Sequence, residues 1–270
     1  IIAGREDERD MAVSGAATER GIWAARGGRG EPLLVLLHGM GANASVWERL
    51  LPLVERSWGG RWLAPDLRGH GRSVREGPYG IGAHAADVAA LIETEAAEAV
   101  TLVGHSFGGA VAALVASGWF GPRVGDVAAF GVKIEWSEAE IEKARGLALR
   151  PTPVFATREE AVERYLRLSG LAGLAEPSSA TAAAGVTGTD GRFQVAMDPR
   201  AWGAVGPSIA ALLRLAAAPL RLAAGERDPM VSLEQMRRID PGARTFAGVG
   251  HNAHWEAPER VWEFIAGGGR

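Results

Sequence analysis

Ser106 stands between two glycines, Gly104 and Gly108, in a segment where a strand is expected to give way to a helix. The run 100–103 reads Val-Thr-Leu-Val, Gly104-His105-Ser106-Phe107-Gly108 follows, and an apolar periodic segment begins at Ala110. A tight strand-to-helix turn crowds the backbone, and small neighbours on both sides relieve that crowding. We therefore expect the Ser106 hydroxyl to stand exposed at the tip of the turn, where it can act as a nucleophile.

A serine hydroxyl is a poor nucleophile at neutral pH, so it needs a base to take its proton and a third group to orient that base. The chain has no cysteine, which excludes disulfides, thiolate chemistry and cysteine-ligated metals. His251 and His254, three residues apart, can also bind a metal, but no third ligand lies at a spacing typical of a metal site. We expect no metal site and no cofactor.

The pattern around Ser106 resembles the nucleophile elbow of the α/β-hydrolase family, which reads G-x-S-x-G in the same strand-turn-helix context. The resemblance implies a catalytic order of serine, acid and histidine along the chain, with the last two in loops after late strands. Residues 225–231, Gly-Glu-Arg-Asp-Pro-Met-Val, are similar to the family's acid loop and give Asp228 as the acid. Residues 248–258 are similar to its histidine loop and give His251 as the base.

Three neighbouring groups are alternatives to these assignments. Glu226 lies in the same loop as Asp228, but not at the matched position. Some members of the family place the acid after the strand that precedes the insertion, where this chain has Glu135. His254 falls at the opening of the closing helix, whereas the resemblance puts the base directly after the last strand, at His251.

Acyl transfer develops negative charge on the substrate carbonyl oxygen, so fixed donors must face that oxygen. The resemblance implies two backbone N–H groups for this oxyanion hole, one from Phe107 and one from Met40 in His38-Gly39-Met40-Gly41. A single glycine precedes Met40, unlike the H-G-G-G form of some lipases, which weakens any prediction of bulky-alcohol esters. Residues 66–73 resemble the family signature D-x-R-G-x-G-x-S and are expected to form a structural loop.

The elements that must position these residues read as alternating strands and helices. The continuous apolar run Leu33–Leu37 is typical of a strand covered on both faces. The alternation predicts an α/β protein, and the resemblance implies the α/β-hydrolase fold: a mostly parallel sheet of about eight strands flanked by helices. Further strands are expected near 12–13, 21–24, 62–66, 100–104, 124–133, 219–224 and 244–247, and helices near 46–54, 81–92, 110–115, 209–217, 233–239 and 258–266.

A block from 137 to 206 interrupts this alternation with helical pieces at 138–149, 158–168 and 175–184 and no strong strand. Such a block is expected to be a helical lid inserted into a core formed by 11–136 and 207–270. Three aromatic residues in or beside it are candidate pocket residues: Trp136, Tyr165 and Trp202. Residues 1–10 are mostly charged after the first four and are expected to be a disordered or artificial extension.

The composition restricts the partners. The net charge is -3, and no basic cluster points to nucleic acid or to an anionic membrane surface. No apolar run reaches the roughly 18 residues that a membrane span requires, and the beginning of the chain lacks a signal-peptide pattern. We expect a cytoplasmic monomer or homodimer whose partner is a small apolar ester.

The expected function is that of a serine hydrolase that cleaves small carboxylic esters through an acyl-enzyme. Because position 106 is serine, the aspartate-based chemistry of the family's epoxide hydrolases and haloalkane dehalogenases is not expected. Carbon–carbon bond hydrolysis, lactone hydrolysis and perhydrolysis remain alternatives on the same triad. A non-catalytic small-molecule receptor that keeps the fold is the alternative outside catalysis.

Overall fold

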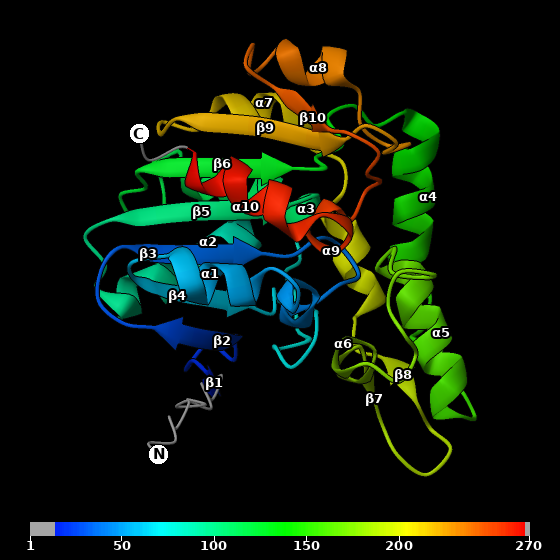
Figure 1. Ribbon diagram of the computed structural model, residues 1–270. Helices are drawn as coiled ribbons and strands as arrows, with labels where there is room; N and C mark the ends of the chain where they lie inside the picture. Colours follow the sequence, from blue (N-terminus) through cyan, green and yellow to red (C-terminus); the bar gives the residue numbers. More distant parts are fainter. Residues whose placement is uncertain (1–13, 268–270) are drawn as a thin grey trace, which may run out of the picture.

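An eight-stranded sheet forms the centre of the computed structural model, which describes residues 14–267 (Figure 1). The β1–β2 and β2–β4 pairs are antiparallel, and the remaining pairs are parallel. This architecture confirms the predicted α/β fold with a mostly parallel sheet. The strands, in spatial order, are β1 (Ser14–Ala17), β2 (Trp23–Gly28), β4 (Arg61–Pro65), β3 (Leu33–Leu37), β5 (Val100–His105), β6 (Asp126–Phe130), β9 (Leu220–Gly225) and β10 (Arg244–Phe246).

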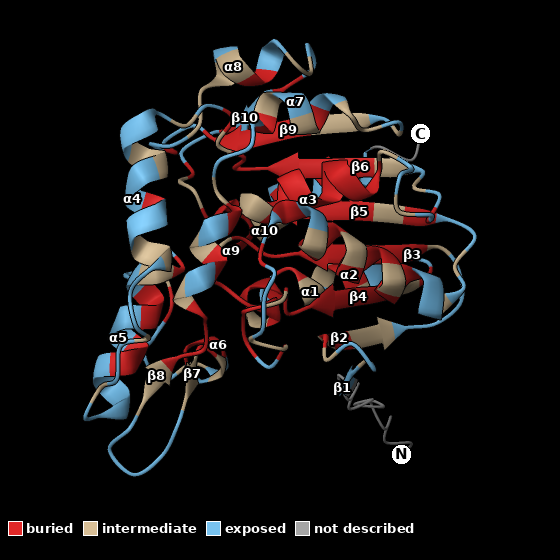
Figure 2. Ribbon diagram, turned by 180° about the vertical axis from the view of Figure 1, so that it is seen from behind, coloured by how far each residue is buried: buried red, intermediate tan, exposed pale blue. Residues whose placement is uncertain are grey.

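Helices cover both faces of the sheet, and the β3 side chains divide between them. Leu34 and Leu36 pack in one apolar cluster with α1 and α10, while Leu33, Val35 and Leu37 pack in another with α2, α3 and α7. Full burial of a leucine stabilises a fold by about 1.5–3 kcal/mol, and burial on both faces is the physical reason for the continuous apolar run. Figure 2 shows β3, β4, β5 and β6 buried along most of their length. The helices are α1 (Leu51–Ser57), α2 (Ile81–Glu95), α3 (Phe107–Val115), α7 (Ile209–Arg214), α8 (Leu233–Arg237), α9 (Ala253–Glu256) and α10 (Pro258–Ala266).

The segment 137–206 lies beyond the carboxyl ends of the parallel strands (Figure 1). Its two longest helices each begin with a capping box, Ser137 with Glu140 and Thr157 with Glu160, which satisfies backbone donors of the first turn. The predicted helices at 138–149 and 158–168 are therefore present almost as expected. The elements of this segment are α4 (Glu138–Ala148), α5 (Arg158–Leu168), α6 (Ala180–Ala184), β7 (Val186–Thr187), β8 (Gln194–Val195) and the 3-10 helix η2 (Pro199–Ala204).

Two helix predictions need correction. The helix expected at 175–184 begins only at Ala180, because the Ser179 side chain accepts a hydrogen bond from the N–H of Ala182 and caps the helix there. The helix expected at 46–54 is split into a 3-10 helix, η1 (Ala44–Trp47), and α1. Asn43 caps η1, and Pro52 lies in the first turn of α1.

Some of the sequence predictions concern parts that the structure leaves undescribed. The extension predicted for residues 1–10 lies outside the described residues, as does the weak strand expected at 12–13. Within residues 14–267, no helix combines the length and the apolar character needed to cross a membrane.

Candidate active site

Ser106 occupies a strained turn between β5 and α3. Its φ of 53° and ψ of -118° lie in a region that side-chain-bearing residues seldom adopt. A Cβ at Gly104 would lie 2.4 Å from the Gly109 Cα, and one at Gly108 would lie 2.2 Å from the Leu37 oxygen. The glycines are therefore required by close backbone approach, as the sequence predicts for such a turn.

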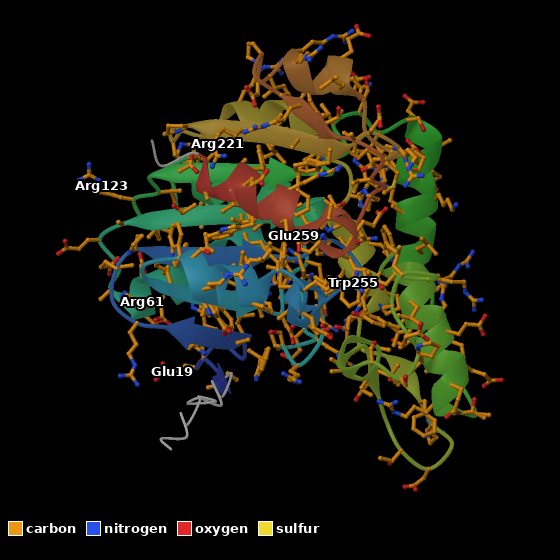
Figure 3. The ribbon with its side chains drawn as sticks, viewed as in Figure 1. Glu19, Arg61, Arg123, Arg221, Trp255 and Glu259 are labelled. Atoms are coloured by element: carbon orange, nitrogen blue, oxygen red, sulfur yellow. The ribbon has the colours of Figure 1, made fainter. Side chains whose placement is uncertain are left out.

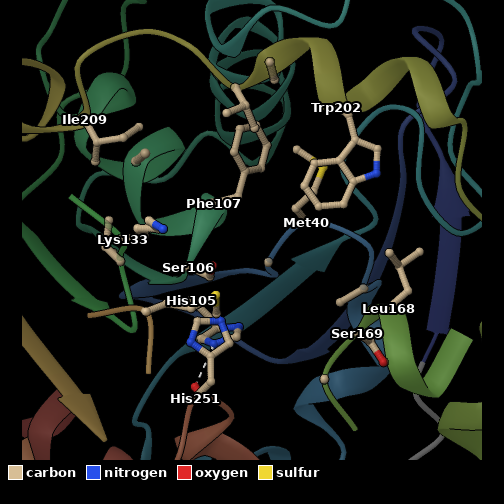
Figure 4. A pocket seen from close by; sticks show the side chains of 18 of the residues that line it. Met40, His105, Ser106, Phe107, Lys133, Leu168, Ser169, Trp202, Ile209 and His251 are labelled. Atoms are coloured by element: carbon tan, nitrogen blue, oxygen red, sulfur yellow. Dashed lines mark hydrogen bonds between the residues drawn. The ribbon is translucent and has the colours of Figure 1, made fainter. Parts of the chain in front are cut away.

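Ser106 lines a cavity of about 290 Å³ whose wall is mostly apolar (Figure 4). The cavity is bounded by the loops that follow β3, β5 and β6, by segment 137–206 and by the loop that carries His251. Loops at the carboxyl ends of parallel strands meet at one edge of the sheet, which brings these distant segments together. Its lining includes Met40, Phe107, Trp136, Leu168, Trp202 and His251.

His251 and Asp228 form a hydrogen-bonded pair beside this cavity. The Nδ1 of His251 lies 2.7 Å from Oδ2 of Asp228, whose side chain is fully buried. The other carboxylate oxygen of Asp228 accepts a hydrogen bond from the Met230 N–H at 2.9 Å. A carboxylate at Nδ1 keeps the proton on that nitrogen, so Nε2 is left able to accept a proton.

The alternative acids have other partners, and the alternative base lies outside the cavity. Glu135 accepts a hydrogen bond from the Gln235 side chain at 2.7 Å and is more than half exposed. Glu226 accepts a hydrogen bond from the N–H of Gly248 at 2.8 Å. His254 is completely buried and does not line the cavity. Among the candidates considered from the sequence, the structure pairs only Asp228 with His251.

The two residues expected to supply the oxyanion hole both line the cavity. Phe107 is the first residue of α3, and the first N–H groups of a helix have no acceptor within it. In the other loop, the N–H of Gly41 donates to His70 Nε2 at 3.1 Å, and that of Ala42 donates to the Gly39 oxygen at 3.2 Å. No described residue accepts from the N–H of Met40, which leaves it available to a ligand.

Buried histidines hold the loop after β3 against the 66–73 loop. His38 donates through Nδ1 to the Gly39 oxygen at 2.8 Å and accepts from the Leu67 N–H at 2.9 Å. His70 Nε2 accepts from Gly41. Burial is the main cause that lowers the pKa of His38 to about 3 and that of His70 to about 4. Both rings are therefore neutral at pH 7 and connect the two loops through hydrogen bonds.

His105 packs against His251 and His254, and its role was not anticipated from the sequence. Its Nε2 donates to the backbone oxygen of His251 at 3.0 Å, and the centres of these two rings are 4.7 Å apart. The centre of the His254 ring lies 4.5 Å from that of His105. Burial above all, and then His254 and His251, hold the pKa of His105 well below its usual value, so its ring is neutral.

The loop that carries His251 is also tied to segment 137–206. The Asn252 side chain donates to the Gly170 oxygen at 2.9 Å, and the indole N–H of Trp255 donates to the Leu174 oxygen at 3.0 Å. Figure 3 shows Trp255 on α9 at the side of the molecule that faces this segment. Both acceptors are backbone groups, so no side-chain pattern in the sequence announces these contacts.

Two of the three aromatic pocket candidates line the cavity, and the third does not. Trp136 and Trp202 lie on its wall. The prediction for Tyr165 is wrong, because this side chain is only 1% exposed and packs in the core on the inner face of α5. The cavity is instead reached at the end of that helix by Arg167 and Leu168, two and three residues beyond Tyr165.

The cations of the cavity wall are already neutralised. The Lys133 ammonium contacts the carboxylate of Glu140 directly and lies 4.9 Å from the centre of the Trp136 ring. The same contact, with the backbone and side chain of Ser137, lowers the pKa of Glu140 to about 2. Among residues 14–267, no group of three or more histidine, aspartate or glutamate side chains is placed to hold a metal ion.

A family model described as "Alpha/beta hydrolase family" matches residues 34–264, which span the elbow, the Asp228 loop and the His251 loop. The chain belongs to the alpha/beta hydrolase family. The match includes all but the first residue of β3 and every later strand of this alpha/beta hydrolase.

Curated relatives of this alpha/beta hydrolase include enzymes of ester chemistry. Lipase LipV of Mycobacterium tuberculosis is 39% identical over 89 residues, 32% of each chain. A pimeloyl-[acyl-carrier protein] methyl ester esterase of Pectobacterium atrosepticum is 38% identical over 89 residues, 33% of this chain and 32% of the relative. These matches thus cover about a third of each relative's length. The magnesium-chelatase 30 kDa subunit of Rhodobacter capsulatus is 28% identical over 232 residues, 78% of this chain and 80% of the relative.

Solved structures share the fold over almost the whole chain. A thioesterase domain from the curacin biosynthetic pathway has a TM-score of 0.79 at 21% identity and covers 94% of this chain and 99% of its own. E-2-(acetamidomethylene)succinate hydrolase has a TM-score of 0.75 at 24% identity, with coverage of 95% and 98%. At these identities the likeness concerns the fold alone.

Proposed function

We propose that the protein is a serine hydrolase that cleaves small carboxylic esters through an acyl-enzyme. The observation that carries this proposal is the Asp228–His251 hydrogen bond of 2.7 Å at the edge of the cavity that Ser106 lines. A histidine oriented by a buried carboxylate, in the same cavity as a serine on a strand-to-helix turn, is the arrangement that activates a serine hydroxyl.

In the proposed mechanism, Ser106 Oγ attacks the ester carbonyl carbon while His251 Nε2 takes the hydroxyl proton. The resulting oxyanion accepts hydrogen bonds from the backbone N–H groups of Met40 and Phe107. His251 then gives the proton to the leaving alkoxide, which departs as the alcohol and leaves Ser106 acylated. Water activated by His251 releases the carboxylic acid in the same way, and Asp228 stabilises the imidazolium in both halves.

The size and the lining of the cavity support a small apolar ester. About 290 Å³ is at the lower end of the range of ligand pockets, and most of the lining is apolar. The part of segment 137–206 that lines the cavity, including Leu168 and Trp202, supports its proposed role as a lid that keeps water from the acyl-enzyme.

The test is hydrolysis of p-nitrophenyl acetate and butyrate by the wild-type protein and by Ser106→Ala. We expect turnover by the wild type and its loss in the variant. A fluorophosphonate probe should label the wild type at Ser106 and leave the variant unlabelled. Turnover retained by Ser106→Ala contradicts the mechanism, and a wild type that is neither active nor labelled supports the receptor alternative.

A further inference from the structure

A second cavity, of about 360 Å³, shares a wall with the candidate active site. Leu168 and Trp202 line both cavities, and Figure 4 shows these two side chains on one side of the first. We call the second cavity the outer chamber. It is lined by Leu147, Arg150, Pro151, Thr152, Pro153, Arg164, Leu168, Val195, Met197, Pro199 and Trp202.

The outer chamber combines an apolar wall with two arginines, Arg150 and Arg164. Neither guanidinium has a carboxylate within 4.0 Å among residues 14–267. Two carboxylates of α5 are engaged elsewhere: Glu160 accepts from the N–H groups at the start of the helix, and Glu163 pairs with Arg167 at 2.5 Å.

This arrangement contrasts with the active-site cavity. There the cations Lys133 and Arg167 each contact a carboxylate of the protein, so they offer little to an anionic ligand. Positive charge that is free to bind an anion is therefore found in the outer chamber, beyond Leu168 and Trp202. An arginine fork matches a carboxylate with two parallel hydrogen bonds.

The chain next to the outer chamber is also unusually apolar for a surface. Leu149 is 87% exposed and Val154 is 48% exposed, and they flank the run 150–153 that lines the chamber. Leu149 and Val154 thus add exposed apolar surface at the two ends of this run. An occupant that suits both features has an apolar arm and an anionic end.

We propose that the outer chamber binds the far end of an ester substrate that carries a carboxylate at the end of an apolar arm. The scissile ester lies at Ser106, the arm passes Leu168 and Trp202, and the carboxylate binds Arg150 and Arg164. This inference rests on the proposed function and adds the substrate class to it. Only esters whose arm is long enough to pass the shared wall gain from the two arginines.

The test uses p-nitrophenyl monoesters of straight-chain dicarboxylic acids of increasing length, each paired with the same ester methylated at its far carboxylate. We expect the ratio of kcat/KM for the charged over the uncharged ester to rise above one only beyond a threshold length. Because both arginines are exposed residues, the double variant Arg150→Gln/Arg164→Gln should lower that ratio by about fivefold. Added salt should lower it in the same direction.

Arg145→Gln is the matched control. Arg145 lies on α4, is 66% exposed in its side chain and does not line the outer chamber. This variant should keep the ratio of the wild type. Two results would mean that charge acts at long range and would overturn the proposal. One is that Arg145→Gln lowers the ratio as much as the double variant does. The other is that the double variant lowers the ratio as much for the ester of the shortest acid as for the long ones.

Two further outcomes separate this inference from the proposed function. If the esters are hydrolysed but the ratio of kcat/KM for the charged over the uncharged ester stays near one at every length, the proposed role of the outer chamber is wrong. The proposed esterase function is then still supported. If no ester is hydrolysed, calorimetric titration of Ser106→Ala with the paired esters decides the matter. Tighter binding of the long charged ester, lost in Arg150→Gln/Arg164→Gln, supports the chamber, and equal binding overturns it.

Discussion

The Nε2 of His105 lies 3.0 Å from the backbone oxygen of His251 and donates a hydrogen bond to it. The residue next to the proposed nucleophile therefore holds the main chain of the proposed base. Asp228 fixes the ring of His251 through Nδ1, while His105 fixes the loop from which that ring projects. Together these contacts hold the imidazole in place from the ring and from the backbone.

We expect His105→Phe to lower kcat by about five- to tenfold and to change KM little. The variant keeps an aromatic ring but removes a donor worth roughly 1 kcal/mol, and the base then samples more positions. His105→Gln, which keeps an amide N–H on a side chain of similar reach, should restore part of the rate. Steady-state kinetics with p-nitrophenyl butyrate measures both. A fall of the same size in the two variants indicates a purely structural role and contradicts the positioning role.

Replacement of Asp228 tests which carboxylate orients the base. Asp228→Asn keeps the shape but no longer favours the tautomer with the proton on Nδ1, so we expect kcat to fall on the order of 10³- to 10⁴-fold. The matched variants Glu226→Gln and Glu135→Gln change carboxylates that are bonded elsewhere, and they should stay within about twofold of the wild type. If kcat falls as much in Glu226→Gln or Glu135→Gln as in Asp228→Asn, that glutamate, and not Asp228, is the carboxylate that orients His251.

The fold and the main loops of the site were predictable because their signals are local. The run Leu33–Leu37 is apolar throughout since its side chains enter two separate cores, and the glycines around Ser106 are required by close backbone contacts. Strand, turn and helix each leave such a mark in a few consecutive residues. The order of the loops along the chain then follows from the family resemblance.

Three features of the site could not be predicted, because they depend on contacts between residues far apart in the sequence. The periodicity of α5 indicates an apolar face, but it does not say whether that face meets the core or the cavity, so Tyr165 was misplaced. His105 acts on a backbone oxygen 146 positions away, and backbone groups are present at every residue. The outer chamber depends on how Leu168 and Trp202, from two separate elements, come together.

The strain at Ser106 predicts a difference between two inactive variants. A residue with φ of 53° and ψ of -118° costs on the order of 1–3 kcal/mol, which glycine largely avoids, although glycine loses about 0.5–1 kcal/mol of chain entropy on folding. We expect Ser106→Gly to be about 1 kcal/mol more stable than Ser106→Ala. The free energy of unfolding from urea titrations measures this difference. Equal stability, or a more stable Ser106→Ala, contradicts the strained geometry.

Buried histidines predict that the fold is sensitive to acid. Burial is the main cause that lowers the folded-state pKa of His254 to about 3, that of His38 to about 3 and those of His70 and His84 to about 4. Unfolded histidine has a pKa near 6.5, so below that pH the unfolded state binds more protons than the folded state. The stability of each neutral ring is fully present above pH 6.5 and declines as the pH falls toward the folded-state pKa, by about 1.4 kcal/mol per pH unit and histidine.

His254→Phe isolates one of these groups. Both ring nitrogens of His254 lack a hydrogen-bond partner among residues 14–267, and the ring lies 4.8 Å from Trp47 and 5.6 Å from Phe130, so an apolar ring suits the site. Its charged or titratable neighbours His105 and His251 stay in place. Between pH 7.5 and pH 5.5, we expect the variant to lose about 1.4 kcal/mol less stability than the wild type, measured by urea unfolding at both values. Equal losses would mean that His254 binds its proton as readily in the folded protein as in the unfolded chain, which contradicts its burial as a neutral ring.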